Sequence, residues 1–458
     1  MKKLLLCLLA LMLAVPALAE GDAAITLTPT GNFGHYASFA DDGSNLIVTS
    51  DEGFEGMVDI QGNELIPCEY GALQETYDVS GYYTVQNESG INMVGAVNAE
   101  GTLVVPMEYG DIDFLSDRWA MAVKLEVTDG ADYDYEALFG DENYIVTAYD
   151  FYDLAAGAMI GTLSRDDLRS AEAFGDYIFV MDHADNVTIY DAAFTAVGSA
   201  DSLYEAYASS DEGVVYLPTG EVVLPGYRYK SDLGYGLLYV ENINYAKGVV
   251  DLEGNIVVPF GEYDYVYEFD LNGYARVEKD SLCGLIDLSG KCVVPCEYDD
   301  IERLYFAGDS VFSLGGYACV EKGGKFGYVS LETGEVTCPI NYVDPTVIGL
   351  SMVARDITGA LYIIAADGTA TSTDYVDVYD STYGDGTLLM VQNAEGFWGL
   401  VDWHGNVLLD FTFDSSYYVT ISPDGTALLV SGLDGKTGYT ISGTPATTTA
   451  APAATVEG

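Results

Sequence analysis

Residues 284–301 read GLIDLSGKCVVPCEYDDI, and this stretch decides the fold. An apolar run that begins at Gly284 is separated by polar residues and Gly290 from a second run that ends at Pro295. Two β-rich runs around a glycine-bearing turn predict an antiparallel hairpin, because glycine adopts the positive φ angles of tight hairpin turns. A proline cannot donate a hydrogen bond to a neighbouring strand, so we expect the second strand to end at Pro295.

The same hairpin pattern recurs along most of the chain. Its copies carry a turn glycine at positions 62, 101, 140, 220, 254, 290, 334, 368 and 405. The interval from Gly140 to Gly220 is twice the usual one, and we expect it to hold a degenerate unit, Val187 to Val197, around Asp191. The repetition predicts ten units of roughly 40 residues each, and a partial eleventh around Gly425.

Each hairpin is accompanied by further strand-like segments. An apolar run precedes it, as in residues 274–277, and a segment such as Tyr298–Ile301 follows it and offers a fourth strand. Three or four short strands in about 40 residues are typical of a propeller blade. One unit cannot bury both of its faces, so it must stack on its neighbours. We therefore predict an all-β, antiparallel repeat array, propeller-like, over residues 20–443.

The two ends of the array predict its closure. The last unit lacks a final strand, and residues 25–29 near the N-terminus provide a spare one that could complete it. The alternative is an open β-superhelix of stacked hairpins, since ten or eleven units exceed the four to eight blades of typical propellers. The segment 115–235 departs most from the repeat, and within it Ser164 to Phe174 predicts a short helix capped by Ser164.

The segment around Trp398-Gly399-Leu-Val-Asp-Trp-His-Gly405 resembles the bacterial WG (Trp-Gly) repeat family. The copies at Gly248, Gly284 and Gly327 are similar to it, although Trp398 is the only tryptophan retained before the glycine. The resemblance implies a repeat scaffold over most of residues 50–440. It implies no catalytic residues.

The N-terminal residues predict export. Lys2 and Lys3 precede an apolar run, and Ala17-Leu18-Ala19 is a small-residue cleavage site, so residues 1–19 form a predicted signal peptide. The apolar run is shorter than the ~20 residues of a membrane-spanning helix. We expect a secreted or cell-envelope exterior protein without membrane insertion after cleavage. Residues 444–458 are rich in Thr, Ala and Pro and predict a disordered tail.

The charge of the chain limits its partners. Asp and Glu number 72 against 17 Lys and Arg, a net charge of −55 at pH 7. Such a surface repels nucleic acid and anionic membranes. The acids are spread through the repeats instead of forming one block, which favours a role in solubility over a defined cation site. We expect a monomer whose partner is an extracellular protein or a glycan.

The cysteines of the exported chain are few for its length. They are Cys68, Cys283, Cys292, Cys296, Cys319 and Cys338. Export permits disulfides, but an apolar chain of this size does not need them. We expect partly buried thiols, with at most one cross-strand bridge from Cys283 to Cys296 or Cys292. The CxxxC spacing of Cys292 and Cys296 does not indicate zinc.

The residues that usually carry catalysis are scarce. The three histidines, His35, His183 and His404, belong to no HExxH motif, and no GxSxG elbow, GxGxxG or complete P-loop occurs. Gly435-Lys436-Thr437 imitates the end of a P-loop but lacks its first glycine, so it is read as a turn. No catalytic or cofactor-binding residue is predicted.

Two acidic loops are the best metal candidates in the sequence. Asp182-His183-Ala184-Asp185 and Asp41-Asp42-Gly43-Ser44-Asn45 place oxygen ligands at loop spacing, which would suit Ca²⁺. Turn chemistry explains the same residues without a ligand, and neither loop matches a complete calcium site. We therefore predict no metal site and no cofactor, and keep Ca²⁺ as the alternative.

These observations favour a non-enzymatic, exported interaction scaffold that binds protein or glycan through the repeat array. The alternative is a secreted hydrolase that acts on polysaccharide or peptidoglycan by carboxylate catalysis. Among so many acids some pair will always lie close, so the sequence does not single out a catalytic pair.

Overall fold

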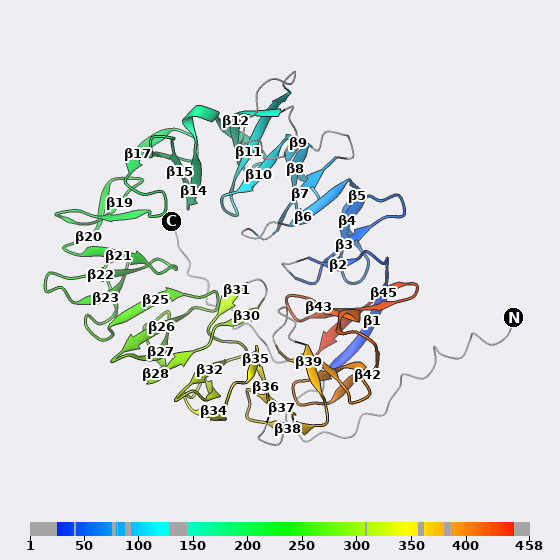
Figure 1. Cartoon of the computed structure of the whole chain (residues 1–458). Helices are drawn as coiled ribbons and strands as arrows, with labels where there is room; N and C mark the ends of the chain where they lie inside the picture. The colour runs from blue at the N-terminus through cyan, green and yellow to red at the C-terminus, as the bar shows by residue number, and fades with distance from the viewer. Residues whose placement is uncertain are drawn as a thin grey trace.

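The computed structural model describes residues 25–40, 43–75, 79, 81–87, 93–127, 144–306, 309–355, 361–379 and 386–443. The predicted signal peptide, Asp41 and Asp42 of the acidic loop, and the predicted tail 444–458 lie outside these ranges. In the described part of the chain, eleven antiparallel blades form a β-propeller (Figure 1). The all-β, propeller-like prediction is confirmed.

The blades are numbered here in chain order, and their strands run from the first, nearest the centre, to the outermost fourth (Figure 1). Blades 1 to 3 are β2(Ser38–Phe39), β3(Leu46–Thr49), β4(Glu55–Val58), β5(Glu64–Tyr70); β6(Ala72–Glu75), β7(Tyr82–Gln86), β8(Val94–Asn98), β9(Leu103–Tyr109); and β10(Asp111–Phe114), β11(Trp119–Val127), β12(Tyr144–Asp153), β13(Ala158–Ser164). Blades 4 to 6 are β14(Ser170–Phe174), β15(Tyr177–Met181), β16(Val187–Tyr190), β17(Ala196–Ala200); β18(Tyr207–Ser209), β19(Gly213–Tyr216), β20(Glu221–Pro225); and β21(Arg228–Asp232), β22(Leu237–Glu241), β23(Lys247–Asp251), β24(Ile256–Val258).

The remaining blades follow the same order and bring the chain back to its start. Blades 7 and 8 are β25(Tyr265–Phe269), β26(Tyr274–Lys279), β27(Leu282–Asp287), β28(Cys292–Tyr298); and β29(Asp300–Ile301), β32(Tyr317–Glu321), β33(Phe326–Ser330), β34(Val336–Tyr342), with the hairpin β30(Leu304–Phe306)–β31(Asp309–Val311) inserted. Blades 9 and 10 are β35(Thr346–Ile348), β36(Ser351–Arg355), β37(Leu361–Ala365), β38(Ala370–Thr373); and β39(Asp377–Tyr379), β40(Leu388–Gln392), β41(Trp398–Asp402), β42(Val407–Phe413). Blade 11 is β43(Val419–Ile421), β44(Ala427–Gly432), β45(Gly435–Ser442) and β1(Thr26–Phe33).

The N-terminal strand closes the ring, as predicted. β1 pairs with β45 as the outermost strand of blade 11, with Thr26 opposite Ser442 and Phe33 opposite Lys436. The predicted strand, residues 25–29, extends four residues further through a bulge between Pro29 and Gly31. Because the last blade takes its fourth strand from the start of the chain, the open superhelix is excluded.

The glycine that precedes each predicted turn lies inside the third strand and permits a close backbone approach. In blade 7 the register of β27 and β28 shifts at Gly284, and a Cβ atom there would lie 2.5 Å from the Val294 carbonyl oxygen. In blades 1 and 8 the same shifts occur at Gly56 and Gly327, where a Cβ atom would lie 2.6 Å from a carbonyl oxygen of the fourth strand. The repeat glycine is therefore required by the bulge of the fourth strand.

This bulge corrects the predicted strand ends. The fourth strands of blades 1, 2, 7 and 8 continue through Pro67, Pro106, Pro295 and Pro339 for three further residues. On an outermost strand, at a shift of register, a proline does not interrupt a ladder of hydrogen bonds, so it does not end the strand. The segment after Tyr298 is not a fourth strand either, because it forms β29, the first strand of the next blade.

The predicted hairpin turns are confirmed, with one displaced. Gly62, Gly254 and Gly290 have φ angles of 86°, 84° and 77°, which only glycine adopts without strain. The degenerate unit around Asp191 is β16–β17. Gly140 lies outside the described residues, and the corresponding turn of blade 3 contains Gly157 instead.

The predicted helix at residues 164–174 is wrong. A single 3-10 turn, η1(Arg165–Asp167), is followed by strand β14, in which Ser170 to Phe174 pair with Met181 to Tyr177. Ser164 lies at the N-cap position, but its hydroxyl bonds to the Asp167 carboxylate at 2.6 Å and not to the backbone. Local capping chemistry is satisfied by one turn, whereas the pairing of β14 with the apolar strand β15 requires the extended form.

The core of the molecule lies between neighbouring blades. In one cluster Met57 and Ile66 of blade 1 pack against Leu73, Tyr83 and Val85 of blade 2, and all five are buried. Similar clusters join blades 6 and 7 and blades 7 and 8. A blade buries its faces only against its neighbours, so the ring is stabilised as a whole.

Antiparallel strands place alternate turns at opposite edges of a blade. We call one edge the hairpin face, formed by the turns between strands 1 and 2 and between strands 3 and 4. The opposite edge is the connection face, formed by the turns between strands 2 and 3 and by the links between blades. The segments 34–37, 242–246, 393–397, 414–418 and 433–434 belong to the connection face.

Candidate interaction surface

The acids of the repeat motif cap their own turns. In blade 1 the Asp59 carboxylate accepts hydrogen bonds from the backbone N–H groups of Gln61 and Asn63, at 2.9 and 2.8 Å. Burial works to raise the pKa of Asp59, but the bonds from Asn63, Gln61 and Gly62 lower it below its usual value. Asp402 accepts from His404 and Asn406 in the same way. These carboxylates serve turn geometry.

The candidate calcium loop of blade 4 is another such turn. Asp182 Oδ1 accepts from the N–H groups of Ala184 and Asn186 at 2.8 and 2.9 Å, and Oδ2 accepts from Asn186 Nδ2 at 2.9 Å. Asp185 forms an ion pair with Arg169, and His183 Nε2 lies 3.2 Å from the Arg165 carbonyl oxygen. Within the ranges given above, no group of three or more His, Cys, Asp or Glu residues could hold a metal ion.

The three histidines lie in different parts of the ring. His35 is exposed in the link from blade 11 to blade 1, and His183 is exposed in blade 4. His404 Nε2 lies 2.9 Å from Asp367 Oδ2, and the His404 ring stacks on Trp403. The contact with Asp367 joins a turn of blade 10 to a turn of blade 9. This contact with His404 lowers the pKa of Asp367. The structure brings no two histidines together.

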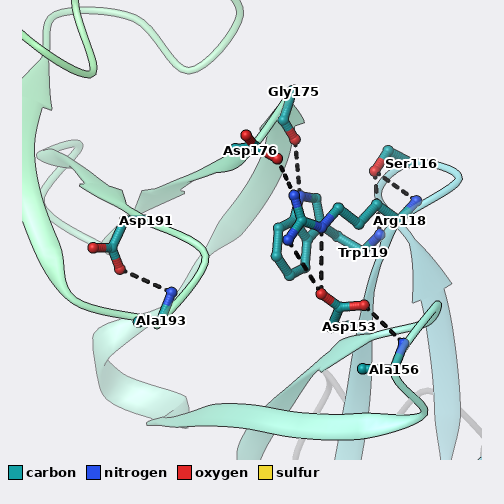
Figure 2. A network of polar contacts seen from close by, with 9 residues as sticks. All are labelled: Ser116, Arg118, Trp119, Asp153, Ala156, Gly175, Asp176, Asp191 and Ala193. Atoms are coloured by element: carbon teal, nitrogen blue, oxygen red, sulfur yellow. Dashed lines mark hydrogen bonds and ion pairs between the residues drawn. The ribbon is translucent and has the colours of Figure 1, made fainter. Parts of the chain in front are cut away.

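A polar network joins blades 3 and 4, where the repeat motif is weakest (Figure 2). The Arg118 guanidinium lies 4.2 Å from the centre of the Trp119 ring and forms ion pairs with Asp153 and Asp176. The buried Trp119 donates from Nε1 to the Gly175 carbonyl oxygen at 3.0 Å. The contacts of Arg118 with Asp176 and of Trp119 with Gly175 cross the blade interface, so the network stabilises the ring.

A second network surrounds the buried carboxylate of Asp150 in blade 3. Asp150 accepts hydrogen bonds from Lys124 Nζ at 2.7 Å, Thr162 Oγ1 at 2.6 Å and the Tyr109 hydroxyl at 2.9 Å. Burial acts to raise the pKa of Asp150, but these three donors lower it below its usual value. The carboxylate is therefore held ionised by a structural ion pair, which a general acid would not be.

The six cysteines of the described residues are free thiols, so the cross-strand bridge considered for Cys283 is absent there. Cys283 is instead opposite Tyr298, and Cys292 is opposite Ile286. Burial raises the pKa of Cys296 and of Cys338 to about 11. Raised pKa values leave little thiolate at neutral pH, so these thiols are poor nucleophiles.

The connection face carries the most exposed apolar side chains. Among the described residues, the five large hydrophobic side chains with the greatest exposure are Leu433, Ile243, Tyr36, Tyr417 and Tyr245. All five lie in turns between strands 2 and 3 or in links between blades. These residues were not singled out from the sequence, because exposure depends on which edge of a blade a turn occupies.

A family model described as "WG containing repeat" matches residues 248–283 and 284–326, in blades 6 to 8. The resemblance to the WG repeat family is confirmed, and fold and repeat together define a β-propeller that contains WG repeats, an architecture suited to a repeat-based interaction scaffold. No curated protein shows significant sequence similarity to the chain.

Several solved structures resemble the chain weakly. A eukaryotic initiation factor is 9% identical, with a TM-score of 0.32, over 74% of this chain and 86% of that one. BamB from Moraxella catarrhalis is 12% identical, with a TM-score of 0.22, over 70% and 97%. The designed Ika8 protein is 11% identical, with a TM-score of 0.23, over 74% and 99%. Likenesses at these scores carry no argument about function.

Proposed function

We propose that this protein is an exported, non-enzymatic interaction scaffold that binds an extracellular protein or a glycan through the connection face. The observation that carries the proposal is the exposure of Leu433, Ile243, Tyr36 and Tyr417 in the loops of one face. Large apolar side chains on loops, held by a rigid framework, are typical of binding surfaces.

The pairing of charged groups in blades 3 and 4 supports a scaffold over an enzyme. Asp150 is bound by Lys124 and two hydroxyl groups, and Arg118 is bound by Asp153 and Asp176. Such pairs resist proton transfer because each charge is already compensated. The side chains of Leu433, Ile243, Tyr36 and Tyr417 are instead exposed, and Tyr and Leu side chains can contact protein or sugar surfaces.

Export is supported by the N-terminal sequence. A basic start, an apolar run and the Ala17-Leu18-Ala19 site are typical of a cleaved signal peptide. Within the described residues, no helix is long and apolar enough to cross a membrane. We propose a monomer, secreted or at the cell-envelope exterior, that binds no nucleic acid because of its net charge of −55.

The alternative, a carboxylate hydrolase, is favoured by one observation. Asp113 and Asp232 lie on the first strands β10 and β21; both residues are exposed, yet desolvation of the carboxyl group raises the pKa of each. A raised pKa is what a general acid needs. The two residues, however, belong to different blades, 3 and 6. Among the described residues, neither of them is paired with a carboxylate of lowered pKa.

The test uses the mature chain, residues 20–458, in glycan arrays and in capture from an extracellular protein fraction. Two connection-face variants are compared, Ile243→Ser/Tyr245→Ser and Tyr36→Ser/Tyr417→Ser/Leu433→Ser. The matched control on the hairpin face is Leu252→Ser/Leu271→Ser. We expect the wild type and the control to retain a ligand that at least one connection-face variant loses. Release of products from polysaccharide or peptidoglycan, abolished by Asp113→Asn, would establish the hydrolase instead.

A further inference from the structure

The basic residues of this chain are confined to one part of the sequence. Residues 4–117 contain no lysine or arginine, and neither do residues 356–435. Of the 17 basic residues, 14 lie between Arg118 and Arg355. In the linear chain the two cation-free stretches are far apart.

Ring closure joins these two stretches. β1 pairs with β45, so blades 10 and 11 lie next to blades 1 and 2, as the red and blue strands of Figure 1 show. The one basic residue within this sector is Lys436, whose Nζ donates to the Ala37 carbonyl oxygen at 2.7 Å. Burial lowers the pKa of Lys436. The exposed charges of blades 10, 11, 1 and 2 are thus carboxylates in the described ranges.

The exposed apolar side chains on the connection face of this sector include Tyr36, Phe397, Tyr417 and Leu433. Leu433 is 99% exposed. Its turn abuts the link that holds Tyr36, since Phe33 is opposite Lys436 and a Cβ atom on Gly435 would lie 2.6 Å from the Phe33 carbonyl oxygen. We call these four residues the seam patch.

The other half of the seam patch is held in the same way. Trp398 is opposite Phe413, which places the turn of Phe397 beside the link 414–418 that contains Tyr417. The Tyr417 ring also lies 5.5 Å from the ring of Tyr379, near the inner edge of blade 10. The seam patch therefore lies on one face of two neighbouring blades, 10 and 11, and of the links from blade 10 to blade 11 and from blade 11 to blade 1.

Exposed carboxylates surround the seam patch. Glu395 shares the turn of Phe397, Asp414 shares the link of Tyr417, and Asp434 follows Leu433. Asp51 and Glu52 lie in the adjacent turn of blade 1. The connection face of blade 6 offers a comparison, because Ile243 and Tyr245 are also exposed there but Arg228 lies 5.5 Å from the Tyr245 ring.

We propose that the seam patch binds a Lys- and Arg-rich protein segment that also carries apolar side chains; this rests on the proposed scaffold function. Charge complementarity selects the occupant. A neutral or acidic glycan gains nothing from a ring of carboxylates, whereas a basic segment gains from it and from cation–π contact with the tyrosines. The apolar side chains of the segment would cover Leu433 and Phe397. The electrostatic field of the carboxylates would steer the approach of the segment.

The test measures binding of one synthetic amphipathic peptide of Lys, Leu and Trp to the mature chain by calorimetry. Polylysine and a peptide with Glu in place of Lys are the comparison probes. We expect Tyr36→Ser/Tyr417→Ser/Leu433→Ser to weaken the peptide at least about tenfold. Glu395→Gln/Asp414→Asn/Asp434→Asn should weaken it too, with reduced salt dependence. Leu252→Ser/Leu271→Ser on the hairpin face is the matched control and should bind as the wild type does.

Several results would overturn the seam proposal. Equal binding by the wild type and the triple serine variant, when both melt at the same temperature, would assign the affinity to diffuse charge. Equal affinity of the wild type for polylysine and for the amphipathic peptide would also assign the binding to diffuse charge. Concentration-dependent dimers that only the triple serine variant loses would assign the seam patch to a second copy. If a natural ligand is lost only by Ile243→Ser/Tyr245→Ser, the scaffold function stands and the seam proposal fails.

Discussion

Lys436 Nζ donates a 2.7 Å hydrogen bond to the carbonyl oxygen of Ala37, a residue 399 positions away in the chain. The bond lies where β45 begins, where β1 ends and where the link to blade 1 starts. It marks the point at which both ends of the described repeat region form one blade.

The closing strand predicts a strong dependence of stability on the N-terminal residues. Deletion of residues 20–33 removes β1 and exposes the edge of β45. It also removes Phe33 from the buried cluster that contains Ala427 and Leu429. We expect loss of the cooperative thermal transition or aggregation, because an unpaired edge strand associates with other chains. Deletion of residues 444–458 is the matched truncation and should leave the melting temperature unchanged. A folded monomer without residues 20–33 would contradict closure.

The repeat glycine of the third strand predicts a large cost for a single methyl group. Gly284→Ala would place Cβ 2.5 Å from the Val294 carbonyl oxygen, against backbone that cannot move aside without breaking the bulge. We expect a loss of about 2–4 kcal/mol in urea unfolding. Gly31→Ala is the control, since its nearest atom would be a Phe33 ring carbon at 3.7 Å. Equal losses for the two variants would refute this account.

The Asp150 network predicts a pH-dependent effect of its cation. Lys124→Met leaves the buried carboxylate without its ion-pair partner and should cost about 3 kcal/mol at pH 7. The folded-state pKa of Asp150 is below its usual 3.8, so its contribution is present above that value and is lost as the pH falls through the folded pKa. Wild type and variant should therefore converge in stability at acid pH. A difference that stays constant down to pH 2 would contradict the ion pair.

The thiols predict an unreactive but reduced protein. Ellman titration of the purified mature chain without reductant should detect six thiols in denaturant and far fewer in the folded state. Burial raises the pKa values of Cys296 and Cys338 to about 11, so little thiolate is present at pH 8. A mass of the purified chain that is lower by two hydrogen atoms would reveal a disulfide instead.

Much of the fold could be predicted from the sequence because each repeat depends on the turn and strand preferences of residues that are close in the sequence. Gly290 supplies a positive φ angle, Asp287 caps the turn, and the apolar runs around them alternate as strands. The closing strand could also be predicted, from a missing strand at one end and a spare one at the other. The displaced turn of blade 3, at Gly157 and not Gly140, could not, since that unit lacks the motif.

Other features depended on partners that are distant in sequence. Ser164 and Asp167 have the chemistry of a helix start, yet Ser170 to Phe174 form a strand because β15 offers them a pairing edge. Pro295 remains inside a strand because β28 is outermost and bulged. In both cases the local preference is worth less than the pairing and packing of the blade.

The sequence by itself determined the repeat, the turn glycines and the absence of basic residues from residues 4–117 and 356–435. Only the tertiary structure decided that these two stretches lie side by side. Pairing of β1 with β45 buries Phe33 and partly buries Lys436 in the closing blade, and it leaves Tyr36 and Leu433 exposed beside them. The physical reason is that a blade is stable only between two neighbours, so the ends of the chain must meet, and the surfaces they carry meet with them.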